Sequence, residues 1–388
     1  MSTAGSDDLF LLDVSRLVWR VWRGGHPTGI DRVCQAYVQH FGTRSQAVVQ
    51  RSGFHFVLSF ADSARLFEIL LADSSGRRRD LIRLAARALP SALRNRARPG
   101  AIYLNVGHTG LNEASLPGWI ADQGLRAVYL VHDLIPLTHP QFCRRGEAEK
   151  HARRMRNMLA SAAGVIGNSR ATLDDLAEFA NANGLPMPPS VVAWISGGTF
   201  ARDVRPRTLS RPHFVAVGTI EGRKNHLLLL DVWRRLVAEQ GKHAPVLLIL
   251  GQRGWQAERV FEQLDRPEEL QGHVQELGTC NDEELAGWIG GARALLMPSF
   301  AEGFGLPVFE ALELGTPVIA SDLPVFREVG GGIPTYLDPQ DSAAWKRTIE
   351  AFCADGPERQ RQVAEIGAFQ APTWGDHFAK VEVWLARL

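Results

Sequence analysis

The stretch Ala294-Leu-Leu-Met297, followed by Ser299-Phe-Ala-Glu302-Gly-Phe-Gly-Leu-Pro307-Val-Phe-Glu310-Ala-Leu312, contains the unit from which the chain is built. A short apolar run predicts a buried strand, a glycine turn follows it, and a helical pattern begins at Pro307. The same order recurs along the second half of the chain. Strands are predicted at residues 214–217, 246–250, 274–277, 294–297, 318–320 and 335–337. Helices are predicted between them, at 225–239, 256–264, 282–289 and 307–314.

Continuous apolar strands that alternate with helices indicate a parallel sheet covered on both faces. The second half therefore predicts a doubly wound α/β domain, with its ligands at the carboxyl ends of the strands. The first half repeats the pattern less regularly. Its predicted strands are residues 9–14, 47–49, 56–58, 101–106, 127–131, 164–167 and 191–195.

A chain of 388 residues exceeds what one hydrophobic core usually organises, so two domains are expected. The segment 196–212 is rich in Gly, Pro and Arg and lacks periodicity, which marks a boundary. We predict an N-terminal domain over residues 1–200 and a C-terminal domain over 201–375. A last helix, at 376–388, is expected to cross back onto the first domain.

The composition narrows the class of protein. A net charge of +1 excludes nucleic-acid binding driven by bulk charge, and 45% apolar residues are ordinary for a globular chain. The cysteines, Cys34, Cys143, Cys280 and Cys353, are far apart, which argues against a disulfide framework or a zinc site. The N-terminus is acidic and polar, without the basic-then-apolar pattern of a signal peptide, so none is expected, and no apolar run approaches the roughly 20 residues of a membrane span. A cytoplasmic protein with reduced thiols is expected.

Glu302 and Glu310 flank the glycine turn at residues 303–305. A turn that opens a helix presents unpaired N–H groups to a phosphate, whereas the carboxylates can accept hydrogen bonds only from hydroxyls. The segment thus suits a ligand with phosphate in the middle and polyols on both sides, as in a sugar nucleotide. Either glutamate alone would be explained by helix capping or a surface ion pair. The pair, placed after a strand, favours binding.

The loop Val217-Gly218-Thr-Ile-Glu-Gly-Arg223-Lys224-Asn-His226 follows the first strand of the second domain. Cations at a helix start oppose the helix dipole, which favours a functional role in neutralising a diphosphate over a solvated helix start. In the first domain, the loop from Gly24 to Arg32, which includes Gly29, is predicted to precede a helix over 33–41. It can approach a ligand through its backbone, but it lacks the full dinucleotide-binding pattern.

His132 ends a predicted strand, where it can either touch a substrate or serve as a structural residue. Ser169 is best explained as a helix N-cap. No Asp-x-Asp or P-loop motif is present, so we expect no metal and no cofactor, and Arg223, Lys224 and backbone N–H groups must meet the diphosphate charge.

The run from Arg77 to Arg98 carries eight Arg against one Asp, with Leu81, Leu84, Ala85 and Ala88 at helical spacing. Its pattern fits contact with an anionic membrane surface, a solvated helix that covers the domain, or an RNA-contacting patch. Its own apolar face lacks Trp and Phe.

These motifs resemble retaining glycosyltransferases of the GT-B fold, family 4, also called group 1. The resemblance covers the second domain well and the first through isolated motifs, and it implies two Rossmann-like domains that face a cleft. It implies that Glu310 binds the ribose hydroxyls and that Glu302 faces the transferred sugar. It further implies that Lys224 and Arg223 neutralise the diphosphate. The other donor-binding positions that it implies are Gly303, Phe304, Gly305, Leu306, Gly218, Thr219 and Gly29, with His132 near the donor sugar. Thr219 departs from the Arg that many members carry.

The sequence of residues 217–226 is similar to that of bacterial mannosyltransferases of polysaccharide assembly. This similarity implies GDP-mannose as the donor. With the family resemblance, we expect transfer of a hexose with retention to a glycan or lipid-linked acceptor. The protein is expected in the cytoplasm, where the Arg77–Arg98 run can hold it peripherally on the inner face of the cytoplasmic membrane. A silent nucleotide-sugar-binding scaffold subunit, tethered through Arg77–Arg98, is the alternative. A GT-B epimerase or phosphorylase is a third hypothesis.

Overall fold

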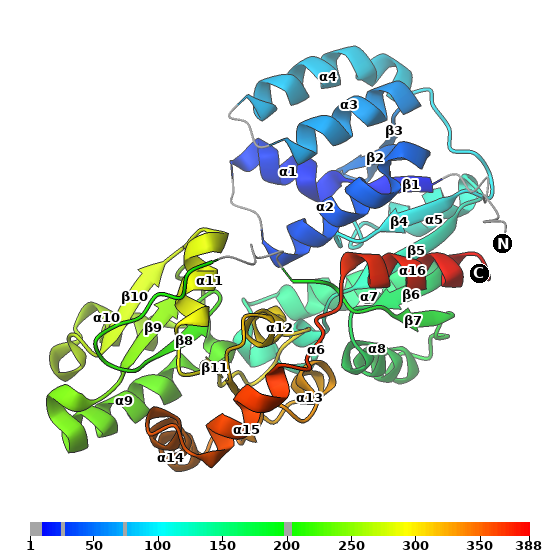
Figure 1. Cartoon of the computed structure of the whole chain (residues 1–388). Helices are drawn as coiled ribbons and strands as arrows, with labels where there is room; N and C mark the ends of the chain where they lie inside the picture. The colour runs from blue at the N-terminus through cyan, green and yellow to red at the C-terminus, as the bar shows by residue number, and fades with distance from the viewer. Residues whose placement is uncertain (1–9, 25–27, 73–75, 198–203) are drawn as a thin grey trace. The chain divides into compact units, whose positions relative to one another are not determined.

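The computed structural model describes residues 10–24, 28–72, 76–197 and 204–388. They form two compact units, which are described one at a time (Figure 1). The first contains the described residues up to Leu134, Ala148–Ile195 and Trp374–Leu388, and the second contains Ile135–Glu147 and the described part of Ser196–Thr373. The boundary expected at residues 200 and 201 lies outside the described residues.

The first unit is built on a seven-stranded sheet of described residues, in the order β3-β2-β1-β4-β5-β6-β7. Its strands are β1 (Phe10–Asp13), β2 (Ser45–Arg51), β3 (Phe54–Val57), β4 (Ile102–Asn105), β5 (Arg126–Val131), β6 (Ala162–Gly167) and β7 (Ser190–Val192). All neighbours are parallel except β2 and β3. The exception has a local cause, because Ser52 and Gly53 join the two strands with φ of 48° and 80°. Two consecutive residues with positive φ make the tight turn of a β-hairpin.

Helices flank this sheet. They are α1 (Ser15–Arg23), α2 (Gly29–Phe41), α3 (Phe60–Leu71), α4 (Arg77–Ala92), α5 (Ser115–Asp122), α7 (Glu147–Ser161), α8 (Arg170–Ala182) and α16 (Trp374–Leu385). The Oγ of Ser169 accepts a hydrogen bond from the N–H of Thr172 at 3.0 Å, which confirms it as the N-cap of α8. Among the described residues, no helix has the length and apolar character needed to cross a bilayer.

The predicted start of α2 at Val33 is wrong by four residues. The helix begins at Gly29, because Thr28 and Asp31 form a capping box. The backbone N–H and Oγ1 of Thr28 donate to Oδ2 of Asp31 at 2.7 and 2.8 Å. Gly29 to Arg32 are therefore helical rather than loop. Gly25 to Pro27, from the same predicted loop, lie outside the described residues.

The second unit is built on a six-stranded sheet of described residues, all parallel, in the order β10-β9-β8-β11-β12-β13. Its strands are β8 (His213–Val217), β9 (Val246–Leu250), β10 (Val274–Gly278), β11 (Leu295–Met297), β12 (Val318–Ser321) and β13 (Thr335–Leu337). Its helices are α6 (Ile135–Thr138), α9 (His226–Gln240), α10 (Glu258–Asp265), α11 (Asp282–Gly290), α12 (Leu306–Glu313), α13 (Pro324–Gly330), α14 (Ser342–Cys353) and α15 (Pro357–Ile366). The predicted parallel α/β architecture is confirmed.

Buried aromatic side chains join the helices of the second unit to its sheet. Trp233 on α9 and Trp345 on α14 are fully buried with Phe214 and Phe352. Each indole N–H is satisfied inside the core, by the carbonyl of Pro245 at 3.0 Å and that of Asp338 at 2.9 Å. Burial of such large rings without an unpaired donor strongly stabilises the core.

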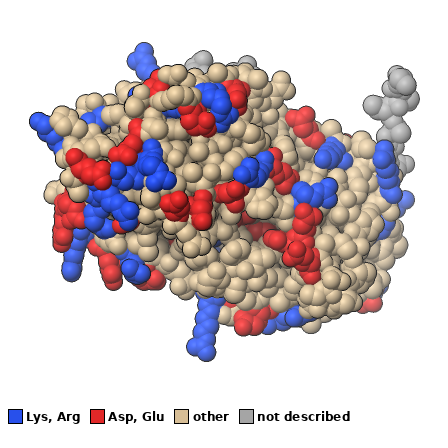
Figure 2. Space-filling view, turned by 90° about the horizontal axis from the view of Figure 1, so that it is seen from below, with Lys and Arg blue, Asp and Glu red and all other residues tan. Residues whose placement is uncertain are grey.

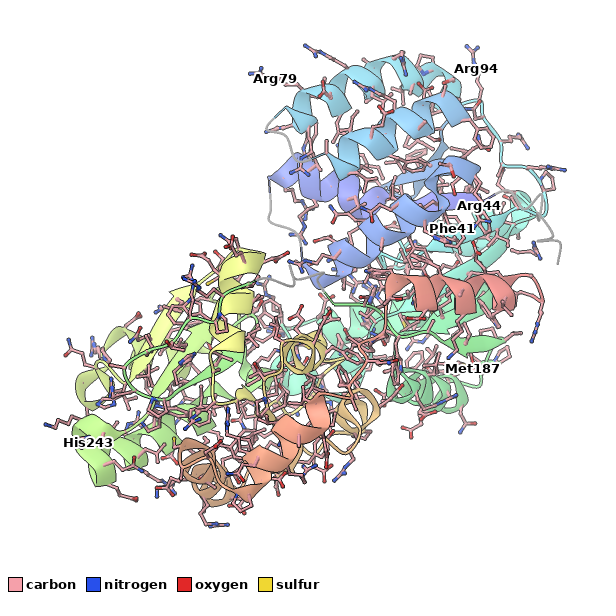
Figure 3. The ribbon with its side chains drawn as sticks, viewed as in Figure 1. Phe41, Arg44, Arg79, Arg94, Met187 and His243 are labelled. Carbon is pink, nitrogen blue, oxygen red and sulfur yellow. The ribbon has the colours of Figure 1, made fainter. Side chains whose placement is uncertain are left out.

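Helix α16 returns to the first unit and packs on α2. The hydroxyl of Tyr37 lies 2.9 Å from Nε2 of His377, and Nδ1 of His377 lies 3.1 Å from the carbonyl oxygen of Trp194. Since a carbonyl can only accept, Nδ1 donates and Nε2 accepts from Tyr37. Nearby, the Arg44 guanidinium lies 4.9 Å from the centroid of the Phe41 ring, as Figure 3 shows beside α16. The last helix is thus held by both polar and aromatic contacts.

We expect His377 to titrate far below an ordinary histidine. Burial lowers its pKa to about 4, even though the hydrogen bond to the Trp194 carbonyl acts in the opposite direction. The unfolded chain binds the proton more readily, so His377 withdraws stability as pH falls from about 6.5 towards 4. An NMR titration of the imidazole, with the resonance assigned by its loss in His377→Gln, should give a midpoint near 4. A midpoint near 6.5 would show that α16 does not bury this ring.

Candidate functional site

The order of the second sheet places its candidate residues at one point. Strands β8 and β11 are neighbours, with β9 and β10 on one side and β12 and β13 on the other. The direction in which the chain adds strands therefore reverses between β8 and β11. In doubly wound sheets, ligands bind outside the carboxyl ends of the strands at this reversal. The two loops predicted from sequence, 218–225 and 298–305, leave these two carboxyl ends.

A cluster of four charged side chains joins these loops. The Glu302 carboxylate forms ion pairs with Nζ of Lys224 and with a guanidinium nitrogen of Arg223, each at 2.6 Å. Arg223 also contacts Glu221 at 2.6 Å. The Glu302 side chain is only 7% exposed, so these ion pairs form largely away from water. Ser299 Oγ donates a further hydrogen bond to Glu302 at 2.8 Å.

Backbone contacts fix the same two loops. The N–H of Phe300 donates to the carbonyl of Arg223 at 2.8 Å, and the Arg223 side chain donates to the carbonyl of Ala301 at 2.7 Å. Asn225 adopts a left-handed conformation with φ of 55°, and its side-chain amide donates to Pro298 and Pro339 carbonyls at 3.2 and 2.8 Å. The loop after β11 therefore determines the position of Arg223 and Lys224 as much as their own loop, after β8, does.

The electrostatics follow from burial and charge. Burial raises the pKa of Glu302, but the Coulombic attraction of Arg223 and Lys224 outweighs it and lowers this pKa to about 2. For Glu221, burial prevails over the same two cations and the pKa is raised. Burial, followed by repulsion from Lys224, lowers the pKa of His226 to about 3. Glu302 is thus ionised near neutral pH, and His226 is neutral.

Two glycines are required by geometry. Gly218 has φ of 119°, and a Cβ there would lie 3.2 Å from Nζ of Lys224. Gly305 has φ of 92°, and a Cβ there would lie 2.8 Å from the Phe326 ring. Side chains rarely adopt such φ values, so both positions favour glycine for conformation and for space. Thr219 follows Gly218, and a Cβ on Gly254 would lie 2.6 Å from its methyl group.

Helix α12 carries the remaining predicted residues of this unit. Gly303, Phe304 and Gly305 precede it, and Leu306 is its first residue. Phe304 is buried, with its ring 5.2 Å from that of Phe309. Glu310 lies one turn into α12 and is 6% exposed. A Cβ on Gly197 would lie 3.2 Å from Cγ of Glu310. The described residues therefore bring Glu302, Arg223 and Lys224 into direct contact and place Glu310 on the helix that follows.

His132 and Gly29 belong to the first unit. His132 directly follows β5, and its Nε2 donates to the carbonyl of Val106 at 2.8 Å. Burial lowers its pKa to about 4, so the neutral ring retains Nδ1 as an acceptor near neutral pH. Gly29 is the first residue of α2.

Two polar features escaped the sequence analysis. Glu221 belongs to the charged cluster, and only its spacing of two from Arg223 could have indicated this. In the first unit, the sheet order reverses between β1 and β4, and Asp31 lies buried near it with Arg16 and Arg20 at 2.7 and 3.0 Å. Arg16 also donates to the carbonyl of Gly107, just after β4, at 3.4 Å. The Thr-x-x-Asp capping box was the available signal for Asp31.

With this geometry established, comparison with known proteins identifies the second unit. Residues 199–367 match the family described as glycosyl transferases group 1. This segment belongs to that family. The matched segment contains the loops after β8 and β11 and the charged cluster between them.

Individual relatives match only part of their own length. The chain is 28% identical to the serotype-specific mannosyltransferase WbdA of Escherichia coli over 247 residues, which cover 60% of this chain and 30% of WbdA. It is 37% identical to the E. coli O-antigen chain mannosyltransferase B over 125 residues, 32% of each chain. The chain therefore spans about a third of the length of these relatives.

Among solved structures, Anabaena HepE in complex with UDP aligns over 98% of this chain and 100% of its own, with a TM-score of 0.66 and 16% identity. At this identity the likeness concerns the fold. Taken with the two α/β sheets, which are parallel apart from β2 and β3, it confirms the predicted pair of Rossmann-like domains of the GT-B fold. Within the described ranges, no group of three or more His, Cys, Asp or Glu residues could hold a metal ion.

The charged cluster predicts a large and specific stability effect. Glu302→Gln leaves Arg223 and Lys224 largely buried without their shared counter-charge, which costs on the order of 3 kcal/mol. Glu365→Gln is the matched control, because Glu365 pairs with Arg361 at the surface, where the loss is about 1 kcal/mol or less. Native-state hydrogen exchange at the buried amides of β8 and β11 measures both. Equal losses in the two variants would contradict a structural role for the cluster.

Proposed function

We propose that the chain is a glycosyltransferase that moves a hexose from a nucleotide sugar to a hydroxyl of a glycan or lipid-linked acceptor. The observation that carries the proposal is the contact of Glu302 with Arg223 and Lys224 at the strand-order reversal, within the segment that matches the glycosyl transferase family. Cleavage of a sugar–diphosphate bond builds negative charge on the leaving group. Preorganised cations at that point stabilise it.

We propose a role for each side chain, following the family resemblance and the contacts described above. Lys224 and Arg223 neutralise the departing diphosphate, and the N–H groups around Gly305 approach it from the start of α12. Glu302 keeps both cations in place before the donor binds, and it accepts a hydrogen bond from a sugar hydroxyl. Glu310, one turn further along α12, accepts from the ribose. Gly303, Phe304, Leu306, Gly218 and Thr219 form the backbone wall of this site. The family resemblance also assigns donor binding to Gly29 and a place near the donor sugar to neutral His132, both residues of the first unit.

We further propose that transfer proceeds with retention. The acceptor oxygen attacks the anomeric carbon on the face that the diphosphate leaves, and the acceptor proton passes to a diphosphate oxygen. This route needs no nucleophilic carboxylate and no metal. It rests on the family resemblance of the motifs.

Mannose from GDP-mannose is our proposed donor. The names of the two E. coli relatives, both mannosyltransferases, support this choice. The sequence of residues 217–226 supports it as well. The HepE complexes hold UDP or UDP-glucose, so UDP-sugars are the main competitors. A silent nucleotide-sugar-binding scaffold subunit is the second candidate. The intact set of Glu302, Glu310, Arg223 and Lys224 argues against a degenerate site.

A donor screen tests this proposal. We expect GDP-mannose to raise the melting temperature more than UDP-glucose or ADP-glucose, because binding stabilises the folded state by mass action.

Glu310→Ala should weaken nucleotide binding, whereas Lys224→Ala should mainly lower turnover. Release of free sugar from the donor would separate an enzyme from a scaffold, and the anomeric configuration of the product would test retention. No stabilisation by any nucleotide sugar would overturn the proposal. A strict requirement for Mn²⁺ would contradict the metal-free reaction.

The charge of the cluster generates a second prediction. Glu221 and Glu302 balance Arg223 and Lys224, so the ionised cluster has a net charge of zero (two positive, two negative). A diphosphate therefore gains net attraction if Glu221, whose pKa burial raises, takes up a proton. Wild-type affinity for a nucleoside diphosphate should rise as pH falls from 8 towards the raised pKa of Glu221.

Glu221→Gln should mimic the protonated residue. It should bind the nucleoside diphosphate several-fold more tightly at pH 8 and show a flatter pH profile. Calorimetry in buffers of different ionisation enthalpy measures the proton uptake directly. Glu283→Gln, a change at an exposed acid on α11, is the control. Weaker binding by Glu221→Gln would show that Glu221 positions Arg223 rather than opposing the ligand's charge.

A further inference from the structure

Large apolar side chains are exposed on one side of the first unit. Trp22, at the end of α1, is 42% exposed, and Ile82, Leu89 and Leu93 of the α4 segment are 50%, 49% and 66% exposed. Ile82, Ala86, Leu89 and Leu93 follow a helical spacing, so they form one stripe along α4. This stripe is separate from Leu81, Leu84, Ala88 and Ala92, which are buried.

A cavity of about 480 Å³ opens beneath this stripe. Trp19, Trp22, Phe56, Ile82 and Leu89 are among its lining residues, and nearly all of the others are apolar as well. Its volume lies within the roughly 300–1,000 Å³ typical of ligand pockets. Because its lining is almost wholly apolar and offers few hydrogen bonds, the cavity suits a hydrocarbon group rather than a polar one.

The α4 segment, which supplies much of the cavity lining, is strongly basic. Of the eight arginines from Arg77 to Arg98, Arg83 and Arg87 pair with Asp80 and Asp62. In the part of the chain that the structure describes, the other six have no carboxylate within ion-pair distance. Arg78 lies 4.7 Å from the Trp22 ring, so charge and apolar surface meet directly. Figure 3 shows Arg79 and Arg94 at opposite ends of α4, both pointing outward.

The distribution of charged side chains around α4 differs from that on another face of the molecule. In the view from below, basic and acidic side chains are interspersed (Figure 2). The α4 segment instead combines uncompensated positive charge with an exposed apolar stripe. A second copy of the chain is a poor occupant, because a two-fold interface through α4 would oppose arginines to arginines.

We propose that this surface binds the hydrocarbon chain of an anionic membrane lipid. The cavity and the stripe of Ile82, Leu89 and Leu93 receive the chain, and the arginines contact the negatively charged headgroups. Trp22, half-exposed at the rim beside Arg78, occupies the position between apolar chains and headgroups that tryptophan favours. The α4 segment is thus both the helix that covers the domain and a membrane-contacting surface. This inference stands independently of the donor and of catalysis.

Vesicle binding by the full chain tests it. Flotation with phosphatidylcholine vesicles, with and without phosphatidylglycerol, should show binding to the anionic vesicles only. Each arginine near an anionic surface contributes roughly a fivefold change in binding, so Arg79→Glu with Arg94→Glu should weaken it about 25-fold or more. Ile82→Asn with Leu89→Asn should weaken it roughly tenfold or more. These side chains are exposed, so both variants should retain their circular dichroism spectra.

Controls distinguish a lipid-chain site from simple charge attraction. Arg266→Glu with Arg347→Glu removes two exposed arginines of the second unit and should leave vesicle binding unchanged. Brominated lipid chains should quench part of the tryptophan fluorescence, and Trp22→Phe should remove part of that quenching. Absence of binding to anionic vesicles overturns the proposal. So does binding that persists in Ile82→Asn with Leu89→Asn, or a concentration-dependent dimer that this variant abolishes.

Discussion

A carboxylate held between two cations determines the geometry of the second unit's site. Glu302 contacts Lys224 and Arg223 at 2.6 Å each, and these residues come from the loops after two neighbouring strands. Because the Glu302 carboxylate is shielded from water, movement of either cation would weaken the pairing of a largely buried charge. The loops must therefore keep their positions together. The hydrogen bond from Phe300 to the carbonyl of Arg223 fixes the same relation in the backbone.

The sheet order explains why such an interaction is available. The loops after β8 and β11 leave the sheet at its strand-order reversal, the place where doubly wound sheets bind their ligands. Gly218 and Gly305 occupy this place with φ values that other residues rarely adopt, and a side chain on Gly218 would contact Lys224. The first sheet has the corresponding reversal between β1 and β4, where Asp31 is held by Arg16 and Arg20. The same topology thus gathers buried ion pairs in both units.

Most of this fold was predictable because it depends on short-range patterns. Continuous apolar runs located the strands, and the glycine turns located Glu302, Glu310, Arg223 and Lys224. The differences arose where a single capping side chain or the conformation of a short turn decides the outcome. The start of α2 depends on the Thr28–Asp31 capping box. The antiparallel β3 depends on the conformation of Ser52 and Gly53.

The α4 segment shows the same limit on sequence analysis. Its own sequence lacks Trp and Phe, which weakens a prediction of membrane contact. Folding brings Trp22 from α1 against Arg78, so the aromatic residue at its rim comes from another helix. Likewise, nothing in the spacing of Arg223 and Lys224 from Glu302 predicts contact, because about 80 residues separate them in the sequence. Sheet topology supplies that proximity.

Stability alone does not account for the charged cluster. Buried ion pairs are costly to desolvate, and apolar residues of similar volume are often as stabilising or more so. A chain selected only for stability could fill the space between the loops after β8 and β11 with apolar side chains, as it does around Trp233 and Trp345. It instead keeps Glu221, Arg223, Lys224 and Glu302 in balance, with the pKa of one acid lowered and that of the other raised. Such a set holds two cations in place with no net charge, and a change of one proton at Glu221 makes it attractive to an anion. This property supports the proposed role of the cluster in binding a leaving diphosphate.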